Sequence, residues 1–148
     1  KEYNHKIRSI CFPEDISENL IKYIIRLKGI KCINNKIGDL YSEDLGKLEC
    51  KAFSSDGPIS FGPTESWDKL LILDAKDYLK CNFTLYKVDL KNTDKIWKEL
   101  KINRIENYEK QIKNKRRPRI KFDDLHNQLK EHITILFKGT FDEIMKKI

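Results

Sequence analysis

The chain has 148 residues, of which 39% are hydrophobic and 36% are charged, and its formal net charge is +7. This length suits one domain, residues 1–148, with a buried core, and the recurring apolar clusters exclude a disordered chain. No apolar run approaches the roughly 20 residues that span a bilayer and no hydrophobic leader is visible, so we expect no membrane segment and no secretion.

The first predicted element is an amphipathic helix over residues 14–28. Apolar residues such as Leu20 and Ile24 recur at spacings of three and four, which is the period of one helix face. Pro13 precedes this segment and Gly29 follows it, which are typical boundary residues for a helix.

Residues 39–53 have the pattern of a β-hairpin. A first strand at 40–41 leads through a turn at 42–46 into a second strand at 48–53. Successive side chains of a strand point to opposite faces. One face of the second strand carries Leu48, Cys50 and Ala52, and the other carries Glu49 and Lys51. The first face can pack on the core, which would leave an acid and a base side by side on an open face.

The rest of the chain alternates strand and helix patterns. A turn-rich loop at 54–66 precedes two buried strands, 70–74 and 83–88. Two helices follow, the first capped by Thr93 and the second opened by a capping box from Asn103 to Glu106. Their predicted inward residues are Ile96, Trp97, Leu100, Ile105, Tyr108 and Ile112.

Pro118 ends the second of these helices. A short helix at 123–130, a strand at 133–137 and a terminal helix at 141–148 complete the chain. The order of elements predicts an α/β fold, with helices flanking a central mixed β-sheet.

Positive charge concentrates between residues 91 and 121. This segment holds twelve Lys or Arg and four Asp or Glu, so the remainder of the chain sums to −1. A focused basic patch attracts polyanions, and arginine forks suit phosphate groups. The alternative is a solvated basic face with no ligand. Six residues with no acid among them form the centre of the patch: Lys113, Lys115, Arg116, Arg117, Arg119 and Lys121.

Three residues of the hairpin have the chemistry of phosphodiester hydrolysis. Asp39 and Glu49, on neighbouring strands, could bind one Mg²⁺, with the backbone carbonyl of Cys50 as a third ligand. Lys51 would orient or deprotonate the attacking water. Asp89, Glu99 and Lys101 repeat the same spacing, but in a segment with helical periodicity, where residues two apart point away from each other.

Gly38-Asp39 followed by Glu49-Cys50-Lys51 on a hydrophobic strand resembles the motif of the PD-(D/E)xK nuclease superfamily, with Gly38 in place of the usual proline. The size and the loop after the motif are most similar to small type II restriction endonucleases. The resemblance implies a fold of the restriction-endonuclease type, with Asp39, Glu49 and Lys51 as the catalytic centre. It also implies sequence-specific cleavage of double-stranded DNA, 5′-phosphate and 3′-hydroxyl products, and pairing of two copies as a homodimer.

The same resemblance points to residues that contact DNA. Segments after the catalytic strand often help to read the bases, and short polar side chains suit groove edges. Lys113 to Lys121 would grip the backbone. Glu18, on the leading helix, could approach the metal, although a solvent-exposed acid is the simpler interpretation. The candidates for contacts near the bases are Ser54, Ser55, Asp56, Ser60, Thr64 and Glu65.

The cysteines show no pairing pattern that indicates zinc, and the chain has no secretory features, so we interpret them as buried free thiols in a reducing, cytoplasmic compartment. They are Cys11, Cys32, Cys50 and Cys81.

Two other functions remain open at this point. A Holliday-junction resolvase or another structure-specific nuclease would have a similar size and charge. A basic nucleic-acid-binding domain without catalysis would use the same patch but would not depend on Mg²⁺.

Overall fold

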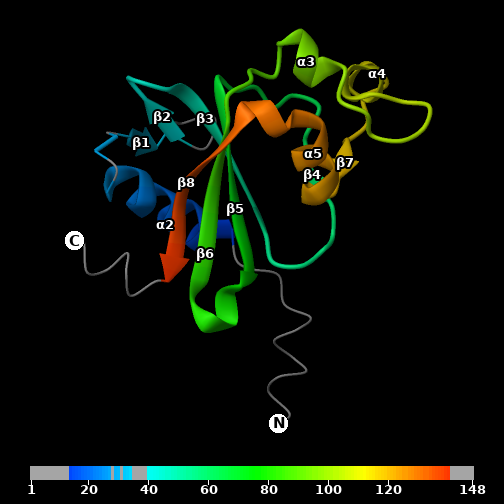
Figure 1. Cartoon of the computed structure of the whole chain (residues 1–148). Coiled ribbons are helices and arrows are strands. Elements are labelled where there is room, and N and C mark those ends of the chain that lie inside the picture. Colours follow the sequence, from blue (N-terminus) through cyan, green and yellow to red (C-terminus); the bar gives the residue numbers. More distant parts are fainter. Residues whose placement is uncertain (1–13, 28, 31, 35–39, 141–148) are drawn as a thin grey trace.

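A computed structural model describes residues 14–27, 29–30, 32–34 and 40–140. A mixed sheet of six strands forms the centre of this part of the chain (Figure 1). In spatial order its strands are β1 (Cys32–Asn34), β2 (Leu40–Ser42), β3 (Gly46–Phe53), β5 (Lys69–Asp77), β6 (Asn82–Val88) and β8 (Ile133–Thr140).

Strands β3 and β5 are parallel, and every other neighbouring pair in this sheet is antiparallel. In the parallel pair, Glu49 lies opposite Leu70 and Lys51 lies opposite Ile72. The chain must therefore return along the length of the sheet between β3 and β5. This return carries β4 (Ile59–Ser60), which pairs with β7 (Arg119–Ile120) in a separate two-stranded sheet.

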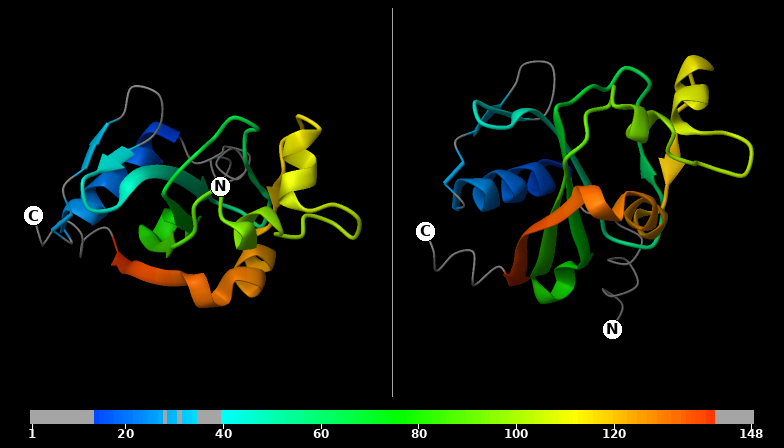
Figure 2. Two further views of the ribbon diagram at one scale, coloured as in Figure 1. Left: turned by 90° about the horizontal axis from the view of Figure 1, so that it is seen from above. Right: turned by 45° about the horizontal axis from the view of Figure 1, so that its top comes forward.

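Helix α2 (Glu14–Leu27) covers one face of the six-stranded sheet (Figure 2). Its buried side chains pack on apolar residues of the central strands, including Leu71 and Leu73 of β5. The helix ends as the sequence predicts: Gly29 has φ +80° and donates its N–H to Arg26, and Ile30 donates to Ile25. The buried helix residues are Leu20, Ile21, Ile24 and Ile25.

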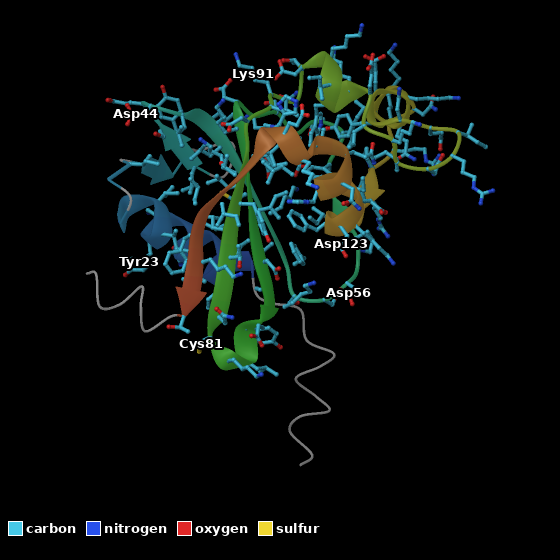
Figure 3. The ribbon with its side chains drawn as sticks, in the orientation of Figure 1. Tyr23, Asp44, Asp56, Cys81, Lys91 and Asp123 are labelled. Carbon is cyan, nitrogen blue, oxygen red and sulfur yellow. The ribbon has the colours of Figure 1, made fainter. Side chains whose placement is uncertain are left out.

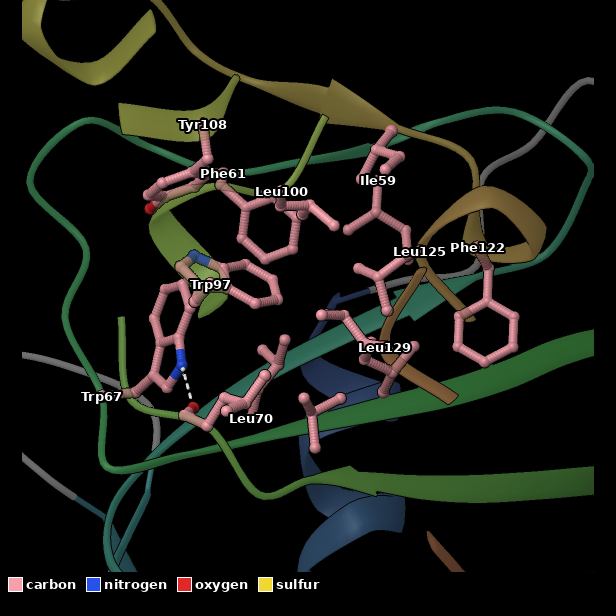
Figure 4. Packing of buried hydrophobic residues seen from close by; sticks show 14 residues of the cluster. Ile59, Phe61, Trp67, Leu70, Trp97, Leu100, Tyr108, Phe122, Leu125 and Leu129 are labelled. Atoms are coloured by element: carbon pink, nitrogen blue, oxygen red, sulfur yellow. Dashed lines mark hydrogen bonds between the residues drawn. The ribbon is translucent and has the colours of Figure 1, made fainter. Parts of the chain in front are cut away.

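A second core lies on the opposite face. It joins the loop after β3 to the helices α3 (Lys95–Lys98), α4 (Tyr108–Lys113) and α5 (Phe122–Leu129). Figure 4 shows its aromatic centre, where the ring centroids of Trp67 and Trp97 are 5.2 Å apart and those of Phe61 and Trp97 are 5.3 Å apart. The indole Nε1 of Trp67 donates a hydrogen bond of 3.0 Å to the carbonyl of Leu90. These contacts hold the loop against the sheet. Two short 3₁₀ helices, Tyr78–Lys80 and Lys130–His132, complete the described elements.

The predicted α/β fold with a mixed sheet is confirmed, as are most of its elements. The leading helix, the hairpin, both following strands, the helix near 123–130 and the strand from residue 133 are present at or near their predicted bounds. The terminal helix predicted at 141–148 lies outside the described residues.

Several local predictions are wrong. Strand β1 lies between the leading helix and the hairpin, where we predicted no strand because the residues show no apolar alternation. Helix α3 begins after Asp94 rather than Thr93, and the Asp94 carboxylate accepts the N–H of Lys91. Ile96 and Ile105, both predicted inward, are 47% and 82% exposed.

The predicted capping box instead closes a turn before the helix. The side-chain oxygen of Asn103 accepts the N–H groups of Ile105 and Glu106, and its amide donates to the Glu106 carboxylate at 3.2 Å. Helix α4 begins later, at Tyr108, where Asn107 caps it by accepting the N–H of Lys110. Asn103 thus accepts the N–H of Glu106 as a capping box requires, but its own N–H donates to the backbone carbonyl of Glu106, and Asn107 caps the helix instead.

Cys81 is also a correction, because it is an exposed free thiol and not a buried one. It ends the first 3₁₀ helix in a left-handed conformation, with φ 55°. Cys50 is partly buried and packs against the core beneath α2. In the part of the chain that the structure describes, no helix is long and apolar enough to cross a membrane.

Candidate active site

Glu49 and Lys51 lie on the same face of β3, as the strand alternation predicts. The Nζ atom of Lys51 is 3.6 Å from Oε2 of Glu49. The Glu49 side chain is only 10% exposed and the Lys51 side chain only 14%. This face is therefore covered, whereas we expected it to be open. The reason is the second core, which places a layer of loop and helices over the face that the sequence pattern left uncovered.

The loop after β3 supplies the cover over Lys51. The ring of Phe61, which is fully buried, lies with its centroid 5.3 Å from the Lys51 Nζ, a distance that suits a cation–π contact. The ammonium group thus has a polar side, toward Glu49, and an aromatic side.

Glu65 makes the shortest contacts of Lys51. The Lys51 Nζ lies 2.8 Å from Oε2 and 3.0 Å from Oε1 of the Glu65 carboxylate. Oε1 also accepts the backbone N–H of Gly62 at 2.6 Å. The sequence motif gave no indication of this contact, because Glu65 follows Lys51 by fourteen residues and lies on a loop rather than a strand.

Two carboxylates therefore face one ammonium group, and their charge reaches the neighbouring core. Burial raises the pKa of the Tyr108 hydroxyl, and the carboxylates of Glu65 and Glu49 raise it further. Tyr108 is 4% exposed and packs against Phe61 and Trp97. The site is thus an acidic cluster with one basic group, walled by aromatic rings.

Asp39, the first member of the motif, lies outside the described residues. Its chain neighbour Leu40 pairs with Leu48, which directly precedes Glu49 in β3. Cys50 lies between Glu49 and Lys51 and pairs with Leu71. Among the described residues, no group of three or more His, Cys, Asp or Glu could hold a metal ion. Glu18 falls within α2, and its side chain is outside the description.

The six basic candidates are all exposed, from Lys113 at the end of α4 to Lys121 before α5. Arg116 is partly engaged, since its Nη1 lies 2.9 Å from the Glu106 carboxylate. Lys113 lies 3.5 Å from Glu109. Among the described residues, the other four candidates form no ion pair, which suits contact with a polyanion.

This basic segment is joined directly to the loop that covers the site. Ser60 pairs with Arg119 across β4 and β7, and Phe61 donates its N–H to the carbonyl of Pro118 at 2.9 Å. A methyl group placed on Gly62 would be 3.3 Å from both Arg117 Nη1 and Glu65 Cδ. The guanidinium group of Arg117 therefore borders the turn that holds Glu65.

The residues of the loop after β3 that we predicted to lie near the DNA bases form two groups. Ser55 and Asp56 line a cavity of about 260 Å³ together with Lys121 and Asp123, and Figure 3 shows Asp56 and Asp123 at the same end of the molecule. Asp56 lies 3.6 Å from Lys76, which also lines this cavity.

The second group lies nearer to Lys51. Ser60 is on β4, Thr64 is exposed on the turn after Gly62, and Glu65 points to Lys51. Ser54 is partly buried directly after β3.

The second copy of the spacing forms no comparable site. Asp89 pairs with Lys69 and Lys87 at 3.4 and 3.3 Å, and Glu99 pairs with Lys95 at 3.9 Å. Helix α3 ends at Lys98, so Lys101 is not on the helix that we predicted, yet no ion pair joins it to Glu99 in the described structure.

A family model for the Bsp6I restriction endonuclease matches residues 2–128, which include both β3 and the basic segment. The chain belongs to the Bsp6I restriction endonuclease family. Searches of curated proteins and of solved structures found no match. Family membership makes this chain a restriction endonuclease, with DNA as its substrate.

Proposed function

We propose that this chain is a Mg²⁺-dependent type II restriction endonuclease of the PD-(D/E)xK superfamily, with Asp39, Glu49 and Lys51 as its catalytic centre. The observation that carries the proposal is the pairing of Glu49 with Lys51 on one face of β3, at 3.6 Å and largely shielded from solvent. An acid and a base two residues apart are the arrangement that the motif requires, and they occur here in a member of a restriction endonuclease family.

The donor chemistry of the site fits Mg²⁺. This ion takes oxygen ligands and is commonly bound through one or two carboxylates, with water and substrate phosphate completing the shell. Glu49 supplies one carboxylate, and Asp39 and the carbonyl of Cys50 would supply the other protein ligands. Bound there, the ion would neutralise charge that develops on the phosphate.

Lys51 and the attacking water would then carry out the hydrolysis. Lys51, held beside Glu49, would orient the attacking water and donate to a phosphate oxygen. Water adds to phosphorus, the bond from phosphorus to the 3′ oxygen breaks, and that oxygen takes a proton. The products would be a 5′-phosphate and a 3′-hydroxyl.

DNA binding would combine the basic segment with the loop after β3. The exposed cations would grip the backbone, and short polar side chains of the loop would lie near the bases. The pairing of Ser60 with Arg119 supports this division, because it fixes the loop and the basic segment side by side. Two copies, paired as a homodimer, would cut both strands.

Cleavage of supercoiled plasmid and phage DNA tests the proposal. Wild type should give discrete bands with Mg²⁺ and none with EDTA, and Lys51→Ala should give none with either. Lys101→Ala is the matched control, because Lys101 ends the second copy of the spacing and has no ion pair with Glu99, so this variant should cut as wild type does.

Other results would redirect the assignment. Resolution of a four-way junction without cutting of duplex DNA would replace sequence-specific cleavage by structure-specific cleavage. Binding without cutting of any substrate would refute the catalytic centre.

A further inference from the structure

We propose that Glu65 is a positioning residue for Lys51, which ties the lysine to the loop that covers the site and to the basic segment behind it. The inference rests on the proposed function, since it assigns Glu65 a role in the same site. It also replaces the base contact that the loop sequence suggested for this residue.

The contacts of Lys51 support this role. Both oxygens of Glu65 are within 3.0 Å of the ammonium nitrogen, whereas the nearer oxygen of Glu49 is 3.6 Å away. A lysine side chain has a flexible stem of four carbons, and its charge stays where its partners hold it. Glu65 therefore fixes the position of the ammonium group more closely than the motif acid does.

Glu65 is itself fixed by the backbone. Its Oε1 accepts the N–H of Gly62, and its own N–H donates to the Gly62 carbonyl at 3.3 Å, which closes a tight turn. There is little space around this turn, because a methyl group on Gly62 would lie 3.3 Å from Cγ and Cδ of Glu65. The carboxylate thus has a defined place before any DNA arrives, which is a requirement of a preorganised site.

The turn is joined to the basic segment. Phe61, directly before Gly62, donates its N–H to Pro118 and places its ring beside the Lys51 ammonium. Arg117 borders the same turn. DNA that displaced Arg117 or the turn would move Glu65, and Lys51 would move with it. Glu65 therefore provides a physical link between the surface that contacts DNA and the catalytic lysine.

An ordinary surface ion pair would look different. Lys95 and Glu99 are 3.9 Å apart, with side chains that are 88% and 60% exposed, and such pairs contribute little. Lys51 and Glu65 are 14% and 25% exposed and are joined by two hydrogen bonds. Glu99→Gln is for this reason the matched control for changes at Glu65.

The test compares Glu65→Ala and Glu65→Gln with wild type and with Glu99→Gln. Two quantities are measured: the single-turnover cleavage rate with excess enzyme on a plasmid that wild type cuts, and the affinity for a linear fragment of that plasmid in EDTA. We expect Glu65→Ala to slow cleavage roughly 100-fold, as misplacement of a catalytic group by about 1 Å can do, with affinity within about twofold of wild type. Glu65→Gln keeps an acceptor for Gly62 and for Lys51, so its loss should be smaller, on the order of 10-fold.

A double-mutant cycle separates positioning from any independent role. If Glu65 acts through Lys51, the change Glu65→Ala will have no further effect in the Lys51→Ala background. The cycle is measured with long incubation at high enzyme concentration, where we expect Lys51→Ala to show a residual rate too slow to give bands in the plasmid assay.

Three results would overturn the proposal. They are wild-type cleavage by Glu65→Ala, a loss of affinity that accounts for the loss of rate, and losses that add in the double mutant. If Glu65→Ala does not fold, as shown by circular dichroism, wild-type cleavage by the isosteric Glu65→Gln would overturn it equally. A wild type that never cuts with Mg²⁺ would contradict the proposed function itself, which is a distinct outcome.

Discussion

Replacement of Gly46 by alanine should destabilise the protein through a single contact that can be isolated. Gly46 begins β3 with φ +82°, a conformation that residues with a side chain rarely adopt. An alanine methyl group there would overlap the carboxylate of Asp68 and lie 2.9 Å from its Cγ and 3.0 Å from its Cβ. Asp68 would have to move, although it is held to Lys47 by two hydrogen bonds, of 2.9 and 2.8 Å.

The magnitude follows from two contributions. The left-handed conformation costs alanine about 1–2 kcal/mol, and the lower entropy of the unfolded chain offsets part of this cost, which leaves about 1 kcal/mol. Displacement of Asp68 loses a hydrogen bond to a charged group, worth about 1.5 kcal/mol. Gly46→Ala should therefore lower the free energy of unfolding by about 2.5 kcal/mol, and the melting temperature by roughly 5–10 °C.

Gly29→Ala is the matched control. Gly29 has nearly the same φ, +80°, but no atom of the described residues lies within 4 Å of the position of the new methyl group. Urea denaturation followed by circular dichroism should give a loss of about 1 kcal/mol for this variant. In an Asp68→Ala background, the cost of Gly46→Ala should fall toward that same value.

Equal decreases in the free energy of unfolding for Gly46→Ala and Gly29→Ala would refute the steric argument, because only a methyl group at residue 46 would contact Asp68. A Gly46→Ala protein as stable as wild type would further contradict the left-handed conformation at the start of β3.

Three further predictions concern the second core, the basic segment and one carboxylate. Trp97→Ala should lower the free energy of unfolding by about 3–5 kcal/mol in urea denaturation, since Trp97 is fully buried; a loss below about 1 kcal/mol would contradict its central place. Arg117→Ala and Arg119→Ala should each flatten the dependence of log affinity on log salt by roughly 0.9, measured by fluorescence anisotropy, whereas an unchanged slope would remove them from the phosphate contacts. The hydrogen bond from Asn103 lowers the pKa of Glu106, so the stability that Glu106 contributes is present above its ordinary pKa and is lost as pH falls through the lowered one. Asn103→Ala should raise that pKa in a carboxyl NMR titration, and an unchanged value would contradict this cause.

The sequence predicted what depends on local periodicity. A pattern of apolar residues within a short stretch of sequence marks each of four elements. They are helix α2, which ends before Gly29, strand β3 around Glu49, and strands β5 and β6. Their apolar residues are buried where the pattern places them. The proximity of Glu49 and Lys51 follows from the same alternation and could be predicted without any tertiary information.

Features that depend on distant parts of the chain could not be predicted. The cover over Lys51 comes from the loop around Phe61, which is held down by residues that follow it by dozens of positions. The contact with Glu65 likewise depends on how that loop folds back. Ile105 shows the opposite error: its helical spacing predicted burial, but the turn closed by Asn103 points it to solvent. Periodicity shows which residues lie on the same face of an element. It does not show whether another part of the chain covers that face.

The pairing of β6 with β8 has a consequence for how relatives of this protein can diverge. Val88, the last residue of β6, lies opposite Ile133, the first residue of β8, and Asp89 donates its N–H to the carbonyl of His132. The segment between them, which contains α3, α4 and the basic residues, thus leaves and re-enters the sheet at one point. A segment with adjacent ends can lengthen, shorten or change composition at small entropic cost to the rest of the chain. Changes in this segment could therefore rebuild the surface that we propose to contact the DNA backbone, while β3, with Glu49 and Lys51, keeps its place.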